Sequence, residues 1–159
     1  METYTVTFFG HRDFCGGKKY QEKLVDILKN IIYEKEYVEF LVGRNGEFDI
    51  FATSCIKLVQ KDCGIHNSFL TLILPYRSAE YENNREYFDA YYDEVAYISE
   101  GRYFKSAIQA RNKYMAERAD LVICYVDKKN GGAYDAVMYA GKLGKKVINI
   151  GDKGERVRV

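Results

Sequence analysis

The chain alternates short apolar runs with longer stretches in which apolar residues recur at every third or fourth position. The runs predict buried strands at residues 3–9, 37–42, 68–74, 94–98, 120–126 and 146–150. The periodic stretches predict helices at residues 17–33, 47–62, 83–92, 104–118 and 132–143. Strands that alternate with helices indicate right-handed crossover units. We therefore expect an α/β fold, a mainly parallel sheet of about six strands with helices on both faces.

Three glycine-containing turns follow predicted strands and precede predicted helices. They span Gly10 to Asp13, Gly43 to Gly46, and Asn130 to Ala133. A helix that begins at such a turn presents free backbone N–H groups, which bind phosphate and other anions. Because the carboxyl ends of parallel strands share one edge of a sheet, we expect the three turns to line one ligand pocket there.

Composition and charge narrow the class of protein. The chain has 159 residues, 47% hydrophobic and 15% aromatic, which predicts a single domain over residues 1–151 and a polar tail at residues 152–159. The formal net charge is +1, and the Lys and Arg residues are scattered along the chain. The basic surface typical of a duplex nucleic-acid binder is missing, so we expect no duplex nucleic acid among the partners.

The sequence predicts no membrane span, metal site or resident cofactor. No apolar stretch approaches the roughly 20 residues of a membrane span, and the N-terminus leads into a strand rather than a signal peptide, so we expect a cytoplasmic protein. The dispersed Cys15, Cys55, Cys63 and Cys124 lack the spacing of metal ligands and predict reduced thiols. The G-x-G-x-x-G and P-loop motifs are absent, which argues against a dinucleotide cofactor and ATP hydrolysis.

Several short segments together resemble the SLOG superfamily, which unites the Smf/DprA DNA-processing proteins with the Lonely Guy (LOG) nucleotide hydrolases. The segments are 8–12, 42–49, 110–115, 119–120, 131–133, 139–140 and 145–147. Among members, the chain looks most similar to the small YpsA-like proteins. The resemblance implies a Rossmann-like fold with a pocket for a nucleotide or a nucleotide-derived signal such as an ADP-ribose relative. It also implies possible homodimers through helices beside the pocket.

The resemblance leaves catalysis open. LOG-type hydrolases cleave the N-glycosidic bond of nucleoside monophosphates with an Arg, which Arg111 matches, and a Glu, whose place is taken here by Ala136. Glycosidic cleavage needs a positioned carboxylate, so we favour a binding module over an enzyme. The alternative is a nucleoside or nucleotide N-glycosidase, either LOG-like or deoxyribosyltransferase-like, in which His11, Asp49 or Asp135 replaces the missing Glu.

The candidate ligand-binding residues come from the turns and from the positions that the resemblance selects. They are Gly10, His11, Arg12, Gly43, Arg44, Asn45, Gly46, Asp49, Tyr76, Arg77, Arg111, Gly131, Gly132 and Ala133. Arg12 and Arg111 suit phosphate, although Arg12 could instead pair with a rim carboxylate and Arg111 could extend toward solvent. Asp49 could line the pocket or complement the dipole of the helix that it begins.

Aromatic residues are densest between Tyr76 and Tyr97, where acidic residues are interleaved with them. Aromatic platforms that bind single-stranded nucleic acid are accompanied by a basic groove, which this segment lacks. Core packing and a subunit interface are the favoured interpretations of the segment.

Overall fold

The computed structural model describes residues 2–99 and 104–151, so the predicted tail at 152–159 lies outside the described residues. The strands are β1 (Thr3–Gly10), β2 (Tyr37–Val42), β3 (Ser68–Tyr76), β4 (Glu94–Ser99), β5 (Leu121–Tyr125) and β6 (Lys146–Asn149). The helices are α1 (Lys18–Glu34), α2 (Glu47–Cys63), α3 (Ala79–Asn83), α4 (Arg85–Tyr91), α5 (Phe104–Arg118) and α6 (Gly132–Lys142).

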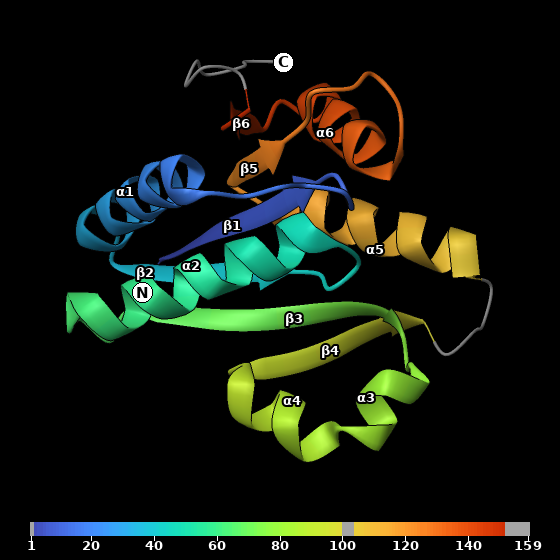
Figure 1. Ribbon diagram of the computed structural model, residues 1–159, viewed down its shortest axis with the longest axis horizontal. Helices are drawn as coiled ribbons and strands as arrows, with labels where there is room; N and C mark the ends of the chain where they lie inside the picture. Colours follow the sequence, from blue (N-terminus) through green and yellow to red (C-terminus); the bar gives the residue numbers. More distant parts are fainter. Residues whose placement is uncertain (1, 100–103, 152–159) are drawn as a thin grey trace.

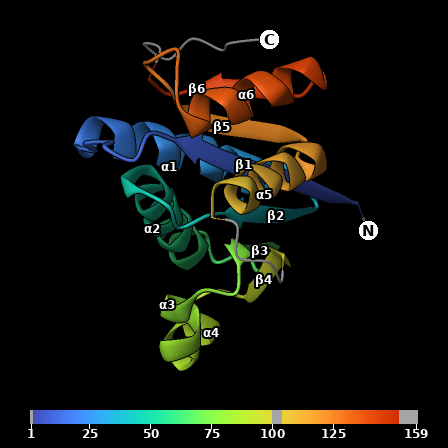
Figure 2. The same ribbon diagram turned by 90° about the vertical axis from the view of Figure 1, so that its right-hand side faces the viewer.

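The six strands form one sheet in the order β4-β3-β2-β1-β5-β6, and every neighbouring pair is parallel. The predicted α/β, Rossmann-like class is therefore confirmed, with a fully parallel sheet. Helices α1 and α2 cover one face of the sheet, and α5 and α6 cover the other (Figures 1 and 2).

Helices cover both faces of the sheet, so both faces are apolar. Successive residues of a strand point to opposite faces. In β1, Phe8 belongs to a core cluster with Leu24 of α1 and Phe48 of α2. Its neighbour Phe9 belongs to a second cluster, with Met115 of α5 and residues of α6. This two-sided burial explains why the strands read as apolar runs rather than as an alternating pattern.

The direction in which strands are added reverses at β1. The chain builds β2, β3 and β4 outward on one side of β1 and then crosses through α5 to place β5 on the other side. Strand β1 thus pairs with β2 on one side and with β5 on the other. Val6 lies opposite Phe40 of β2 and Leu121 of β5. The loops after β1 and β5 leave the sheet in opposite directions, which opens a crevice at their carboxyl ends.

The segment between β3 and β4 differs from the prediction of one helix over 83–92. It forms two short helices (Figure 1). The first, α3, is capped by Ser78, whose Oγ accepts a hydrogen bond from the N–H of Tyr81 at 3.2 Å. Asn84 has φ −129° and ψ 30° and interrupts the helical path before α4. Of the aromatic residues, Tyr81, Phe88 and Tyr92 are buried in the core, as core packing predicts, whereas Tyr87 is exposed.

No helix in the described part of the chain is both long enough and apolar enough to cross a membrane.

Candidate functional site

A cavity of about 390 Å³ lies at the carboxyl edge of the sheet, and the three glycine turns meet there. We call it the main cavity. Turn residues, the first turn of α2 and one face of α5 form its walls. The lining residues are Phe8, Phe9, Gly10, His11, Arg12, Asp13, Gly43, Asn45, Gly46, Asp49, Ile108, Arg111, Asn112, Met115, Lys128, Asn130, Gly131, Gly132 and Ala133.

Arg111 is the most buried charged side chain of the main cavity, with 4% of its surface exposed. Its Nε donates to Oδ1 of Asn112 at 2.9 Å, and its Nη1 donates to Oδ1 of Asn45 and to the carbonyl of Ile73, each at 3.3 Å. All three acceptors are neutral. Burial lowers the pKa of Arg111 and the nearby Asp49 opposes that shift, yet a guanidinium keeps its charge in a protein.

Gly43 leaves room for this guanidinium. A Cβ at position 43 would lie 2.7 Å from Nη1 of Arg111 and 3.1 Å from Oδ2 of Asp49. Those separations are shorter than van der Waals contact, so any side chain at position 43 would displace one of the two groups. The glycine of this turn therefore has a steric role beyond turn geometry.

Asp49 lies in the first turn of α2 and accepts a hydrogen bond from the N–H of Asn45 at 2.8 Å. Burial raises the pKa of this carboxyl, while Arg111, the Asn45 amide and Arg12 oppose the shift. The N–H of Glu47 in the same turn donates to the carbonyl of Arg12 at 3.1 Å. Two N–H groups at the start of α2 are thus bonded within the protein, so this turn offers fewer donors to an anion than the sequence suggested.

The start of α6 is more open to a ligand. Gly131 has φ 95°, a conformation that favours glycine, and the first intrahelical bond runs from the N–H of Asp135 to the carbonyl of Gly131 at 3.0 Å. The N–H groups of Gly132, Ala133 and Tyr134 donate no hydrogen bond within the described part of the chain. They form the positive end of the helix dipole at the wall of the main cavity.

His11 and Asp127 join the loops that follow β1 and β5. Nε2 of His11 accepts a hydrogen bond from the N–H of Asp127 at 3.1 Å and also lies 3.2 Å from the carboxylate Oδ1 of the same residue. Nε2 accepts in the first contact only when it carries no proton and could donate in the second only when it carries one, so this nitrogen cannot make both bonds at once. A general-base role for His11 would compete with this bond.

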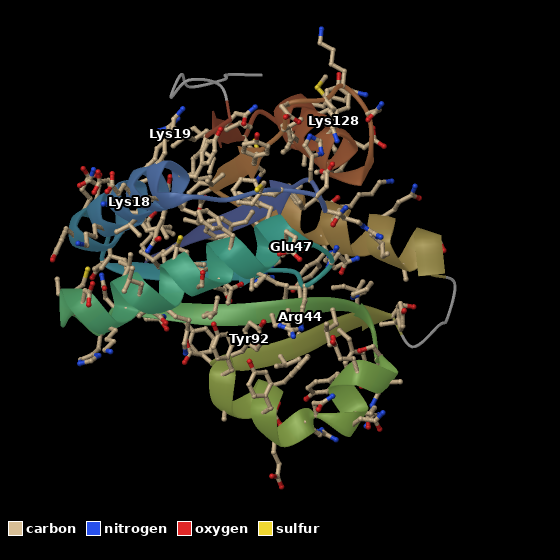
Figure 3. All side chains as sticks on the ribbon, in the orientation of Figure 1. Lys18, Lys19, Arg44, Glu47, Tyr92 and Lys128 are labelled. Atoms are coloured by element: carbon tan, nitrogen blue, oxygen red, sulfur yellow. The ribbon has the colours of Figure 1, made fainter. Side chains whose placement is uncertain are left out.

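A second tie between the same loops is an exposed ion pair, with Nζ of Lys128 lying 2.9 Å from Oδ2 of Asp13. This contact lowers the pKa of the Asp13 carboxyl. Lys128, labelled in Figure 3, also lines the main cavity, which gives the cavity a third cation beside Arg12 and Arg111.

Four predicted site residues do not line the main cavity, namely Arg44, Tyr76, Arg77 and the catalytic candidate Asp135. Arg44 turns toward α3 and α4, where it lies 3.4 Å from Oε1 of Glu80 and 3.5 Å from the hydroxyl of Tyr92 (Figure 3). Its guanidinium also stands 4.9 Å from the centre of the Phe88 ring. Tyr76 and Arg77 lie outside the lining as well, and Arg77 pairs with Glu82. Arg44, Tyr76 and Arg77 therefore lie outside the main cavity, and a ligand contact by any of them stays a prediction.

A second hollow of about 640 Å³, the side cavity, adjoins the main cavity between α5 and α6. Asp135, a catalytic candidate of the sequence, lines the side cavity instead of the main one, as does Ala136. Sequence reasoning missed Asn112 and Lys128 of the main cavity, although each lies within two residues of a predicted site residue or turn. Among the described residues no cluster of His, Cys, Asp and Glu could hold a metal ion.

No protein-family profile and no curated protein sequence match this chain. Its fold is similar to that of DNA processing protein A (DprA) from Streptococcus pneumoniae, with a TM-score of 0.66 at 17% identity over 91% of this chain and 49% of that one. DprA from Helicobacter pylori gives a TM-score of 0.62 at 14% identity, covering 91% of this chain and 63% of that one.

The molybdenum cofactor carrier protein from Chlamydomonas reinhardtii is also similar, with a TM-score of 0.58 at 12% identity over 94% of this chain and 78% of that one. The chain spans less than two thirds of either DprA protein. At these identities the comparisons establish the fold alone.

The comparison with the H. pylori protein corrects the expectation about partners, which excluded duplex nucleic acid. That protein binds single-stranded DNA, so the fold of this chain also occurs in a nucleic-acid binder. The expectation rested on net charge and on scattered basic residues, and neither property reports the local charge of one cavity. Arg12, Arg111 and Lys128 converge on the main cavity although they are 17 residues or more apart in the sequence.

Proposed function

We propose that this chain is a binding module for a nucleotide or a nucleotide-derived signal of the ADP-ribose type, held by its phosphate in the main cavity. The observation that carries the proposal is Arg111, a buried cation whose hydrogen-bond acceptors are all neutral. Burying a charge without a paired opposite charge costs free energy. Asp49 attracts this cation but forms no ion pair with it, so a bound phosphate would supply the hydrogen-bonded negative charge.

The surroundings of Arg111 suit a phosphate. The free N–H groups at the start of α6 and the exposed side chain of Arg12 border the same cavity. Arg12 makes no ion pair within the described residues, so its fork of donors is available to phosphate oxygens. Two guanidinium groups and a helix N-terminus are the usual donors for a phosphate in proteins.

The proposal agrees with the binding roles of the similar folds. One is a molybdenum cofactor carrier and another binds single-stranded DNA, so binding rather than chemistry is their common element. Placement among the YpsA-like branch and in the cytoplasm stays a prediction from the sequence.

The test is a thermal-shift titration of the whole chain with AMP, ADP-ribose, adenosine and a short single-stranded oligonucleotide. A ligand at a hundredfold its dissociation constant adds about 2.7 kcal/mol of stability, a shift that is easily measured. We expect AMP or ADP-ribose to stabilise wild type but not Arg111→Met, and adenosine to stabilise neither. Equal shifts in both proteins would contradict the proposal.

An N-glycosidase is the second candidate, favoured by one observation. Asp49 lines the main cavity, and burial raises the pKa of its carboxyl, as in carboxyl groups that act as general acids. Incubation of AMP with wild type, with detection of free adenine, distinguishes the two candidates. We expect intact AMP after binding, whereas turnover that Asp49→Asn abolishes would favour the enzyme.

A further inference from the structure

The side cavity is continuous with the main cavity. Five residues line both hollows: Arg12, Ile108, Asn112, Gly131 and Gly132. A ligand anchored by its phosphate at the start of α6 therefore stands at the entrance of the side cavity. The two hollows are two compartments of one site.

The side cavity is a groove between two helices. Gly132, Ala136 and Tyr139 follow one another at helical spacing on α6, and Ile108 and Asn112 do so on α5. At 1.5 Å of rise per residue, Ala136 lies about 6 Å and Tyr139 about 10 Å along α6 from Gly132. A group joined to the phosphate through a sugar would thus reach the wall formed by these side chains.

The walls of the groove are apolar and its rim is polar. Ile108, Ala136 and Tyr139 supply hydrocarbon and aromatic surface, and Tyr139 is held by its hydroxyl, which donates to Oε2 of Glu117 at 2.5 Å. Gln109 and Lys113 of α5 add donors, and Lys113 Nζ lies 5.8 Å from the centre of the Tyr139 ring. A flat ring with polar atoms at its edge fits such a lining.

Arg12 stands where the two compartments meet. It lines both, its side chain is exposed, and its guanidinium makes no hydrogen bond or ion pair within the described residues. A guanidinium binds phosphate oxygens through its edge and stacks on aromatic rings through its face. This one residue can therefore contact both halves of a nucleotide.

We infer that the side cavity receives the planar base of a nucleotide whose phosphate occupies the main cavity. The ligand class is then nucleoside phosphates, in preference to sugar phosphates or inorganic phosphate. The inference rests on the proposed function, because the phosphate anchors the ligand at the junction of the two compartments.

The test compares AMP, GMP, UMP, ribose 5-phosphate and inorganic phosphate by isothermal titration calorimetry on the whole chain. We expect at least one nucleotide to bind about tenfold or more tightly than ribose 5-phosphate, the size of effect typical of a base stacked on an aromatic side chain. Tyr139→Ala and Ala136→Leu, which open or fill the side cavity, should abolish that preference and keep binding of ribose 5-phosphate.

Tyr114→Ala is the matched control, since Tyr114 lies on the neighbouring helix α5 but lines neither cavity. It should keep the preference. Circular dichroism verifies that each variant folds. If Ala136→Leu does not fold, Tyr139→Ala alone tests the inference.

The outcomes separate the two proposals. If wild type binds ribose 5-phosphate as tightly as every nucleotide and Arg111→Met binds neither, the inference is wrong and the proposed function stands. A preference for nucleotides that survives both side-cavity variants also overturns the inference, because the base then binds elsewhere. If wild type binds none of the five compounds, both proposals are wrong.

Discussion

The guanidinium of Arg111 occupies space that a side chain at Gly43 would need, since a Cβ there would lie 2.7 Å from its Nη1. Gly43→Ala should push the guanidinium away from Asn45 and the Ile73 carbonyl. Displacing a charge-assisted contact should weaken AMP binding about tenfold or more in calorimetry. The free energy of unfolding should fall by only about 1 kcal/mol, because the clash is with the end of a long side chain.

Two glycines serve as comparisons for that variant. Gly17→Ala meets no atom within 4 Å and should leave affinity unchanged, while stability falls by about 1 kcal/mol or less because Gly17 is the N-cap of α1, where alanine is disfavoured. Gly10→Ala places a Cβ 2.1 Å from Cγ of the buried Phe48, so it should destabilise the protein by about 1 to 3 kcal/mol or more. Normal AMP affinity in Gly43→Ala would mean that the position of Arg111 does not determine binding.

Arg111→Met should separate binding from stability. Methionine keeps much of the side-chain volume but removes the buried charge, and the relief from that desolvation offsets the three hydrogen bonds that are lost. We expect AMP affinity to fall more than tenfold and the urea-derived free energy of unfolding to change by about 1 kcal/mol or less. A loss above about 3 kcal/mol would identify Arg111 as a structural residue.

Asp13 and Lys128 should affect affinity in opposite directions. The Asp13 carboxylate pairs with Lys128 at the rim of the main cavity, where it competes with a phosphate for the same ammonium group. Asp13→Asn should therefore tighten AMP binding and Lys128→Ala should weaken it, each by roughly two- to tenfold and less at high salt. Lys129→Ala is the control, because Lys129 does not line either cavity. Weaker binding by Asp13→Asn would show that the carboxylate assists the ligand.

Stability at alkaline pH should depend on Cys55. Burial raises the pKa of this thiol to about 11, whereas in the unfolded chain it loses its proton near pH 8.5. For a raised pKa the stabilisation is complete below the unfolded value and is lost as the pH rises through the folded one. Between about pH 8.5 and 11 wild type should lose on the order of 2 kcal/mol from this group.

Urea unfolding at several pH values measures that loss. Cys55→Ala should show a shallower decline in stability across the alkaline range, from a lower starting value because a small cavity remains. Cys15→Ala should decline like wild type, since Cys15 is exposed. Parallel curves for Cys55→Ala and wild type would contradict the prediction.

The two arginines show what could and could not be predicted from the sequence. The glycine turns predicted the edge of the sheet where the cavity lies, because turns and strands are recognised from neighbouring residues. Which arginine turns inward is not local. Arg111 finds acceptors 38 and 66 positions away, and Arg44 is drawn outward by Glu80 and Tyr92, 36 and 48 positions away. Partners at such distances become visible only once the elements are packed.

Helix bounds also differ in how well the sequence predicts them, as α5 and the pair α3 and α4 show. The bounds predicted for α5 match those observed, 104–118. The break between α3 and α4 depends on two single residues, the cap at Ser78 and the non-helical Asn84. Apolar periodicity is judged over many residues and does not detect single-residue features.

The reversal of strand order at β1 has a consequence for the order of events during folding. The N–H of Thr5 donates to Asp120, 115 residues later, and Nε2 of His11 accepts from the N–H of Asp127, 116 residues later. The two walls of the crevice therefore meet only after most of the sheet has formed. Contacts of such high contact order form slowly. A ribosome-bound chain that has not yet released β5 therefore lacks one wall of the main cavity.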